Sequence, residues 1–482
     1  MSAAGTGATS RRSVDAVVVG SGPNGLAAAL TLARAGLEVE VFEGAPSPGG
    51  GCRTEELTLP GFAHDVCSTV HPLLAASPFF ARAGLEGVTL RTPEVAFAHP
   101  LDGGRAASVT ASVELTADSL GEDASSYRRL LGPLVKDSPA IIPSALAPLV
   151  APPSHPLAMA RFGLQGLLPL SILSRRFATA PARALLAGLG AHSMRPLSAP
   201  GTGAFALFLG ILAHAVGWPV VEGGSARIVD ALIGDLSAVG CELHTGHWIS
   251  DLDELPRARI TMLDLTPRQL LALAGERVPA RYRRALERFR YGPGVCKVDW
   301  ALSGPVPWAA EECRAAPTIH LGGTLEEIAR SEADVAAGRH CERPFCIAVQ
   351  PCLLDPGRAP EGQQTFYAYC HVPVGSSVDM SDRIEAQIER FAPGFRDLVL
   401  ARRSITAVET ERQNPNYVGG DINGGSATLA QTIFRPTVSL HPYRTQLPGL
   451  YLCSSSTPPG GGVHGMCGEG AARAALGDLA RR

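Results

Sequence analysis

Short apolar runs alternate with glycine clusters at the start of the chain. Residues 17–19 are three valines, a β-branched run of the kind buried in a parallel sheet, and the run stops at Gly20. The next stretch, LAAALTLARAG, consists of good helix formers and ends at Gly36, a typical C-terminal stop. Residues 38–42 then predict a second strand. This order of strand, helix and strand predicts an α/β fold that begins with a Rossmann-like unit.

The turn between the first strand and the helix carries the pattern G-x-G-x-x-G. Its glycines are Gly20, Gly22 and Gly25, and Ser21 lies between the first two. The first glycine allows a tight turn, the second lets the backbone approach a pyrophosphate, and the third lets the helix pack on the strand. Glu43 follows the second strand, where an acidic side chain accepts hydrogen bonds from an adenosine ribose. The sequence therefore predicts a dinucleotide site with phosphate at the positive end of the helix.

A second glycine cluster follows Glu43. Gly50 and Gly51 stand just before Arg53 in the stretch APSPGGGCRTEE. A cofactor with a second half needs such a loop beyond the ribose-binding acid, which favours FAD over NAD. Arg53 is the expected donor to a phosphate or to the flavin, because its planar fork suits phosphate. The alternative is an ordinary surface arginine.

The first stretch and the following GGGCRTEELTLPGFAHDVCS resemble the amino-terminal part of phytoene desaturase-like flavoproteins, within the amine-oxidase and Rab-GDP-dissociation-inhibitor (GDI) fold group. Gly61, Phe62 and Asp65 match the family turn G-F-x-x-D-x-G, whereas Cys67 replaces its last glycine. The resemblance implies FAD as the cofactor. It also implies a Rossmann-like FAD-binding domain, with an α+β substrate domain inserted.

The resemblance also suggests the domain boundaries. The segment WPVVEGGS resembles the point where the chain re-enters the FAD domain, and it implies that the backbone of Ile249 meets adenine. We therefore expect a discontinuous FAD-binding domain and a substrate domain, preceded by a disordered tail. The expected ranges are 1–13 for the tail, 14–75, 219–268 and 445–482 for the FAD-binding domain, and 76–218 and 269–444 for the substrate domain.

The inserted part reads mainly as short helices. Repeated prolines break residues 72–217 into short helical patterns, and such an apolar shell suits a pocket for a lipophilic substrate. Residues 201–217 predict a buried helix, with a membrane-dipping helix as the alternative. Residues 266–290 predict one helix, and the strands VCKVDWAL, FCIAVQP and TFYAYCHVP follow.

Three residues in those strands are candidates for chemistry. In the amine-oxidase relatives a lysine in a strand shortly before an aromatic-ending loop lies near flavin N5, with a water between them, so the resemblance gives Lys297 a role in tuning the flavin. The alternative is a strand lysine that faces solvent. Tyr369 and His371 alternate on one strand face and could act as acid or base, or could simply be structural.

The carboxyl-terminal segment gives the second cofactor signal. A strand over residues 450–453 is followed by a glycine turn and a helix. The start of such a helix offers backbone N–H groups and a positive dipole to a flavin that gains charge on reduction. The segment resembles the closing motif of the family, which assigns Gly461, Gly462 and Val463 to the cofactor.

Composition excludes several classes of protein. The net charge of −3 gives no reason to expect nucleic acid as a partner. The 11 scattered cysteines suggest neither a disulfide framework nor a metal site, and they fit a reducing, cytoplasmic location. No apolar run reaches the roughly 20 residues of a membrane span, so any membrane contact would be peripheral. The oligomeric state stays open.

The sequence thus predicts an FAD-dependent oxidoreductase. We expect a dehydrogenase or desaturase that moves hydride from a largely apolar, isoprenoid- or lipid-like substrate to flavin N5. No second glycine pattern follows a strand, so oxygen, a quinone or another acceptor must reoxidise the flavin. The alternatives are a redox-neutral double-bond isomerase, an amine oxidase that uses Lys297, and a prenyl- or lipid-binding protein without redox chemistry.

Overall fold

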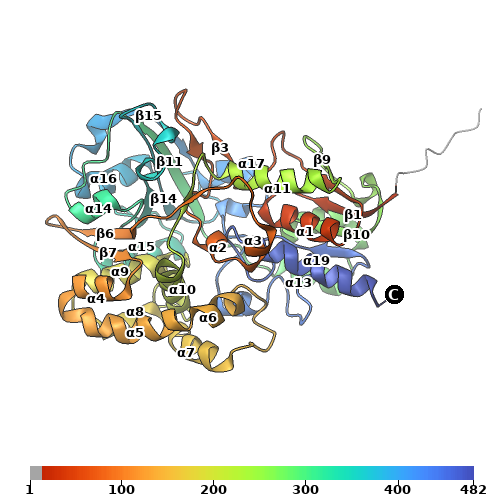
Figure 1. Cartoon of the computed structure of the whole chain (residues 1–482), viewed down its shortest axis with the longest axis horizontal. Coiled ribbons are helices and arrows are strands. Elements are labelled where there is room, and N and C mark those ends of the chain that lie inside the picture. The colour runs from red at the N-terminus through yellow and green to blue at the C-terminus, as the bar shows by residue number, and fades with distance from the viewer. Residues whose placement is uncertain (1–12, 482) are drawn as a thin grey trace, which may run out of the picture.

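Two large β-sheets organise the chain (Figure 1). The structure is a computed structural model, and it describes residues 13–481. Ser13 already begins the first strand, so the prediction of a disordered tail is wrong at this residue. The rest of that tail, residues 1–12, lies outside the described part of the chain.

The first sheet has five strands, and every neighbouring pair is parallel. In spatial order the strands are β16 (Leu450–Leu452), β10 (Arg257–Leu263), β1 (Ser13–Val19), β2 (Val39–Phe42) and β9 (Glu242–His244). The strands predicted at both ends of the chain thus meet in one sheet. Apart from Ser13, all of them fall within the proposed FAD-binding ranges, and the domain division itself remains a proposal.

Helices cover both faces of this sheet. They are α1 (Pro23–Arg34), α11 (Ala226–Ala238) and α19 (Met466–Leu479) on one face, and α12 (Pro267–Ala274) and α13 (Ala280–Glu287) on the other. Val18 belongs to the first of these two cores, and its neighbours Val17 and Val19 belong to the second. Alternate residues therefore point to opposite faces, and both faces are apolar, as expected for a buried parallel sheet.

The pair α12 and α13 corrects the prediction of one helix over residues 266–290. A 3-10 turn at Gly275–Arg277 separates the two helices. Gly275 has a φ of 51°, which continues no right-handed α-helix, and Pro279 immediately precedes α13.

The second sheet has seven strands, and its neighbours are antiparallel except for β12 and β6. In order they are β15 (Val399–Ile405), β11 (Gly294–Leu302), β14 (Gln364–Val372), β13 (Cys346–Val349), β12 (Thr318–Leu321), β6 (Val95–Leu101) and β7 (Arg105–Thr110). The hairpin of β6 and β7 was not predicted, because Pro100 interrupts its first strand and alanines dilute its second.

Further helices, most of them short, follow along the chain, and several of them have a proline in their first turn. Before the parallel sheet resumes they are α2 (Pro72–Ala75), α3 (Pro78–Ala83), α4 (Val113–Ser119), α5 (Ala124–Lys136), α6 (Ser138–Ala145), α7 (Pro156–Gly166), α8 (Leu170–Leu173), α9 (Ala180–Ala191) and α10 (Thr202–Ala215). After it come α14 (Glu311–Ala315), α15 (Leu325–Ala336), α16 (Ser381–Phe391), α17 (Ala407–Gln413) and α18 (Leu429–Ile433). Two small ribbons complete the strands, β3 (Thr54–Glu55) with β4 (His64–Asp65), and β5 (Leu90–Arg91) with β8 (Val220–Val221).

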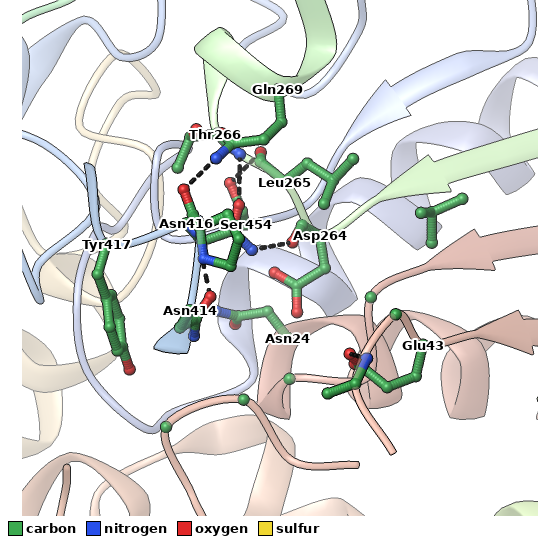
Figure 2. A pocket seen from close by; sticks show the side chains of 18 of the residues that line it. Asn24, Glu43, Asp264, Leu265, Thr266, Gln269, Asn414, Asn416, Tyr417 and Ser454 are labelled. Atoms are coloured by element: carbon green, nitrogen blue, oxygen red, sulfur yellow. Dashed lines mark hydrogen bonds between the residues drawn. The ribbon is translucent and has the colours of Figure 1, made fainter. Parts of the chain in front are cut away.

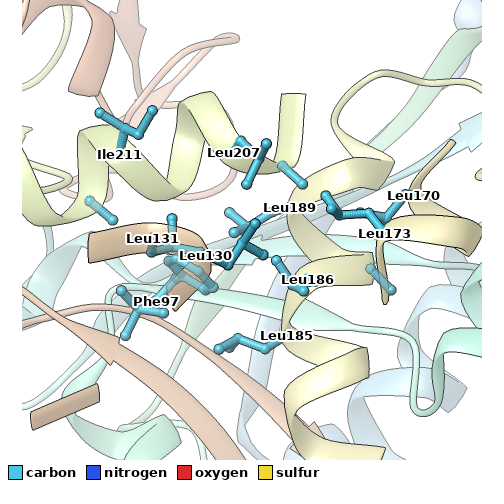
Figure 3. Close-up of a cluster of buried hydrophobic side chains, with 14 of the residues drawn as sticks. Phe97, Leu130, Leu131, Leu170, Leu173, Leu185, Leu186, Leu189, Leu207 and Ile211 are labelled. Carbon is cyan, nitrogen blue, oxygen red and sulfur yellow. The ribbon is translucent and has the colours of Figure 1, made fainter. Parts of the chain in front are cut away.

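The helices between residues 124 and 215 build one apolar core against the seven-stranded sheet (Figure 3). Leu207 and Ile211 of α10 are fully buried in it beside side chains of α5, α8 and α9. The prediction of a buried helix at residues 201–217 is therefore confirmed. Among residues 13–481 no single helix is long and apolar enough to span a membrane, although α7 and the stretch Leu170–Arg176 meet the criterion together, as a pair bent by 90°.

Candidate active site

A cavity of about 600 Å³ opens at the carboxyl ends of β1, β2 and β10, where α/β sheets bind ligands. Most of the predicted cofactor residues line it, namely Gly20, Gly22, Glu43, Gly50, Gly51, Arg53 and Ile249. Ser21 and Gly25 lie behind this wall, and both are buried. Gly461, Gly462 and Val463 do not line the cavity, and Ser454, Ser455 and Ser456 line it from the same carboxyl-terminal segment.

The glycine-rich turn has no room for side chains. A Cβ at Gly25 would lie 2.1 Å from the carbonyl oxygen of Gly20. A Cβ at Gly22 would lie 2.6 Å from Oδ2 of Asp264. The turn therefore brings bare backbone to the cavity and to the start of α1, as the sequence predicted.

Glu43 ties this turn to the end of β2. Its Oε2 accepts hydrogen bonds from the backbone N–H of Ser21 at 2.9 Å and from the Ser21 hydroxyl at 2.7 Å. Its Oε1 accepts one from the backbone N–H of Ala45 at 2.8 Å. Oε1 has a further lone pair, so Glu43 can fix the turn and still accept a hydrogen bond from a hydroxyl of a ligand.

Asp264, which the sequence analysis missed, faces the same turn from the end of β10. Its Oδ2 accepts a hydrogen bond from the backbone N–H of Gly25 at 3.0 Å. Burial raises the pKa of Asp264 to about 7, against the effect of that hydrogen bond, and the charge of Glu43 adds to the rise. The rule that ligands bind beyond the carboxyl ends of parallel strands could have found this residue.

The loop after α17 closes another side of the cavity. Figure 2 shows Asn416 between the end of β10 and the loop, where its Oδ1 accepts from the backbone N–H of Thr266 at 3.1 Å and its Nδ2 donates to the Asp264 carbonyl at 2.9 Å. Tyr417 reaches the second glycine cluster, because a Cβ at Gly51 would lie 2.1 Å from its hydroxyl. This loop is therefore part of the cavity wall.

Several polar atoms of the cavity residues are buried without a hydrogen-bond partner among residues 13–481. They are Oδ1 of Asn24, Nε of Arg53 and Oε1 of Gln269. Buried polar atoms are nearly always paired in native proteins. The two unpaired acceptors and the charged donor thus suit a polar ligand.

A second cavity, of about 40 Å³, adjoins the first and shares Gly50, Arg53 and Tyr417 with it. Lys297 of β11 and Tyr369 of β14 line it. These elements belong to the seven-stranded sheet, so the two cavities connect the glycine-rich turns with that sheet.

Lys297 is buried, so the alternative of a strand lysine that faces solvent is wrong. Its Nζ donates to the Asp65 carbonyl at 3.1 Å and forms an ion pair with Asp299 at 2.5 Å. Burial alone would raise the pKa of Asp299, but Lys297 and His64 hold it below its ordinary value. The ion pair of Lys297 with Asp299 therefore lies at the edge of the second cavity.

His371 and Tyr369 lie on the same face of β14, with ring centroids 6.0 Å apart. Nδ1 of His371 lies 2.9 and 3.0 Å from the two carboxylate oxygens of Glu332, a residue of α15. Both members of this pair are buried. The sequence analysis missed Glu332, because no local pattern distinguishes a buried glutamate from an exposed one on a helix.

Comparisons with known proteins agree with this geometry. Residues 18–82 match the family described as NAD(P)-binding Rossmann-like domain. The mouse protein named pyridine nucleotide-disulfide oxidoreductase domain-containing protein 2 is 28% identical over 96% of this chain and 94% of its own length. Hydroxyneurosporene desaturase of Cereibacter sphaeroides is 28% identical over 97% and 98%. Among solved structures, a triple mutant of putrescine oxidase has a TM-score of 0.63 at 16% identity and covers 98% of this chain and 99% of its own.

The fold, the site and these relatives define an FAD-dependent oxidoreductase. Within that class the chain is phytoene desaturase-like, in the amine-oxidase and GDI fold group. The residues present fit FAD. The glycine turn presents bare backbone to the cavity, unpaired polar atoms line the cavity, and its volume lies in the range of ligand sites.

Proposed function

We propose that this oxidoreductase is a dehydrogenase that introduces a double bond into a largely apolar, isoprenoid- or lipid-like substrate. The observation that carries the proposal is the shared wall of the two cavities. Gly50 and Arg53 belong to both, and the second cavity adds Lys297 and Tyr369 from the other sheet. A relative named for the desaturation of hydroxyneurosporene supports the substrate class.

The proposed cofactor residues divide into three groups. The pyrophosphate would be held by Gly20, Ser21, Gly22 and Gly25, the adenosine by Glu43 and Ile249, and the rest of FAD by Gly50, Gly51 and Arg53. The roles of Gly461, Gly462 and Val463 stay a prediction from the resemblance. When bound, FAD supplies a two-electron acceptor that takes hydride from one C–H bond. The proton of the adjacent C–H bond must then go to a base, and the electron pair of that bond forms the new C=C bond.

We propose that His371, which lines neither cavity, accepts this proton through Tyr369, which lines the second cavity, and that Glu332 holds the imidazole in place. The carboxylate binds Nδ1, so it orients the ring and stabilises the imidazolium that forms when the other nitrogen takes a proton. Glu332 is buried and has no arginine or lysine in ion-pair contact among residues 13–481, which makes His371 its partner.

Contact with a lipid surface belongs to the same proposal. The bent pair of α7 and the stretch Leu170–Arg176 leaves Leu157 and Leu164 exposed at 84% and 72%, and Arg175 and Arg176 follow. Exposed leucines beside arginines suit the interface of a membrane with anionic lipids. We expect the protein to float with vesicles that contain anionic lipids. It should not float with vesicles of neutral lipids at high salt.

The decisive experiment is anaerobic addition of isoprenoid and lipid fractions to the purified, FAD-loaded protein while its visible spectrum is recorded. We expect one fraction to bleach the flavin and to yield a product with two hydrogens fewer. A product of unchanged mass without bleaching would favour the isomerase alternative. Bleaching by amines alone would favour the amine oxidase, and a protein that binds these fractions without any change in them would favour a lipid-binding role.

Glu332→Gln is expected to slow flavin reduction by on the order of 100-fold, with little change in KM or in FAD affinity, because the base loses the carboxylate that orients and stabilises it. His371→Asn should have a similar effect, and the double variant should be no slower than either single one. Stopped-flow measurement of the rate of flavin reduction from pH 5 to 9 would check this. The pH–rate profile of the variants should lose the limb that reports protonation of the base. His99→Asn is the matched control, since His99 is buried in the same sheet and binds only the Gly323 carbonyl. Normal reduction in Glu332→Gln would refute the assignment.

A further inference from the structure

Arg435 is a buried arginine that has no acidic partner. It follows α18, and its exposed fraction is 4%. Its guanidinium donates to three backbone carbonyls, from Nη1 to Ser455 at 2.9 Å, from Nε to Gln431 at 3.2 Å and from Nη2 to Gly425 at 3.4 Å. None of residues 13–481 offers it a carboxylate within ion-pair distance.

Such a charge is costly to bury without a counter-charge. By contrast, Arg358, which is also deeply buried, contacts the carboxylates of Asp65 and Asp355. Asp421 forms no ion pair with Arg435 and instead accepts the backbone N–H groups of Gly292, Asn423 and Gly425. Burial lowers the pKa of Arg435, and Cys467 and Asp421 offset only part of this. The site thus leaves a positive charge for something else to balance.

The position of Arg435 shows where that balance would come from. Two of the three carbonyls that it binds belong to Ser455, which lines the large cavity, and to Gly425, the neighbour of the lining residue Gly424. Its Nη1 also lies against the carboxyl-terminal glycine turn, because a Cβ at Gly460 would be 2.8 Å from it. The guanidinium therefore stands directly behind the cavity wall, on the side formed by the carboxyl-terminal segment.

We infer that Arg435 is a positioning residue for the cofactor, whose charge is balanced by an anionic group of bound FAD. The inference rests on the FAD assignment, but not on the substrate. Two groups of FAD have this chemistry, the pyrophosphate and the flavin ring, which becomes anionic on reduction. The hydrogen bonds of Arg435 go to residues of the cavity wall. Its charge therefore acts on the cofactor through its electrostatic field, and its hydrogen bonds position the carbonyls of Ser455 and Gly425.

Arg435→Gln tests the inference with two measurements on the intact chain. One is the Kd of oxidised FAD for the apoprotein, and the other is the midpoint potential of the bound flavin. If the pyrophosphate supplies the charge, we expect the Kd to rise at least tenfold. If the ring supplies it, we expect the reduced form to bind about tenfold less well relative to the oxidised form, which lowers a two-electron potential by about 30 mV.

Arg435→Lys keeps the charge and is the second variant, so the test survives if Arg435→Gln does not fold. It should retain most of the affinity and potential of the parent protein. Arg444→Gln is the matched control, because Arg444 lies in the same segment but pairs with Asp478 away from the cavity. The inference falls if folded Arg435→Gln keeps both values, or if Arg435→Lys loses as much as Arg435→Gln. A parent protein that binds no FAD would instead refute the cofactor assignment, and one that binds FAD without reacting would refute only the proposed substrate.

Discussion

Replacing Arg358 with methionine is expected to lower the free energy of unfolding by about 3–5 kcal/mol at neutral pH, because the change leaves two buried carboxylates without their cation. Arg358 is 1% exposed. Its Nη1 donates to Asp65 at 2.9 Å, its Nε to Asp355 at 2.6 Å and its Nη2 to the Val221 carbonyl at 3.0 Å. The guanidinium thus joins three distant parts of the chain beside the second cavity.

The effect should depend on pH. Burial would raise the pKa of Asp65, but Arg358 and the hydrogen bonds from Ser225 and Thr54 hold it below its ordinary value. A carboxyl with a lowered pKa in the folded state stabilises the protein above its unfolded pKa, and this contribution disappears as the pH falls. The penalty of Arg358→Met should therefore be largest at neutral pH and shrink toward pH 4.

Urea unfolding from pH 4 to 8 would measure this effect. Arg34→Met is the control, because Arg34 and its partner Asp235 are both partly exposed, and it should leave the stability nearly unchanged. Adding Asp65→Asn and Asp355→Asn to Arg358→Met should recover part of the loss. A loss that is no larger than that of the control would show that the ion pairs do not stabilise the fold.

The fold was largely predictable because its first and last segments carry local patterns. The glycines that need close backbone contact, the acid after β2 and the strand before the last helix all follow from residue type and spacing. The lining of the cavity by the carboxyl-terminal segment did not follow. The helix α19 begins at Met466, and Ser454 to Ser456 line the cavity instead of the predicted Gly461, Gly462 and Val463.

The chemistry of the second cavity could not be predicted in the same way. Alternation along a strand indicates which residues share a face, but not which face meets solvent. All nine residues of β11 are buried, because helices or strands cover both faces of the seven-stranded sheet, so Lys297 has no exposed face to point to. Glu332 lies 39 residues from its partner His371 in sequence, and Asp65 lies 293 residues from Arg358. Pairs of this kind depend on the three-dimensional fold, and no local pattern encodes them.

Asp264→Asn is expected to stabilise the apoprotein by about 4 kcal/mol at pH 8 and by about 1 kcal/mol at pH 5. The pKa of Asp264 is about 7 in the folded protein and near 4 in the unfolded chain. A group whose pKa is raised by folding contributes stability fully below the unfolded pKa and loses it as the pH rises through the folded pKa. Three units correspond to about 4 kcal/mol. Asparagine can still accept the hydrogen bond from Gly25 but never ionises.

Thermal or urea unfolding of the two apoproteins from pH 5 to 8 would show the difference growing with pH. Asp478→Asn is the matched control, because Arg444, Arg481 and Tyr451 lower the pKa of Asp478 against the effect of burial, so its loss should not vary over this range. Glu43→Gln should move the midpoint of the Asp264 effect to lower pH, since the charge of Glu43 contributes to the raised pKa. A constant difference from pH 5 to 8 would mean that Asp264 is already ionised at pH 5.

In the holoprotein the same carboxyl faces the turn proposed for the pyrophosphate. We therefore expect FAD to bind more tightly when Asp264 is protonated. The affinity for FAD should fall as the pH rises above 7, and Asp264→Asn should abolish this pH dependence.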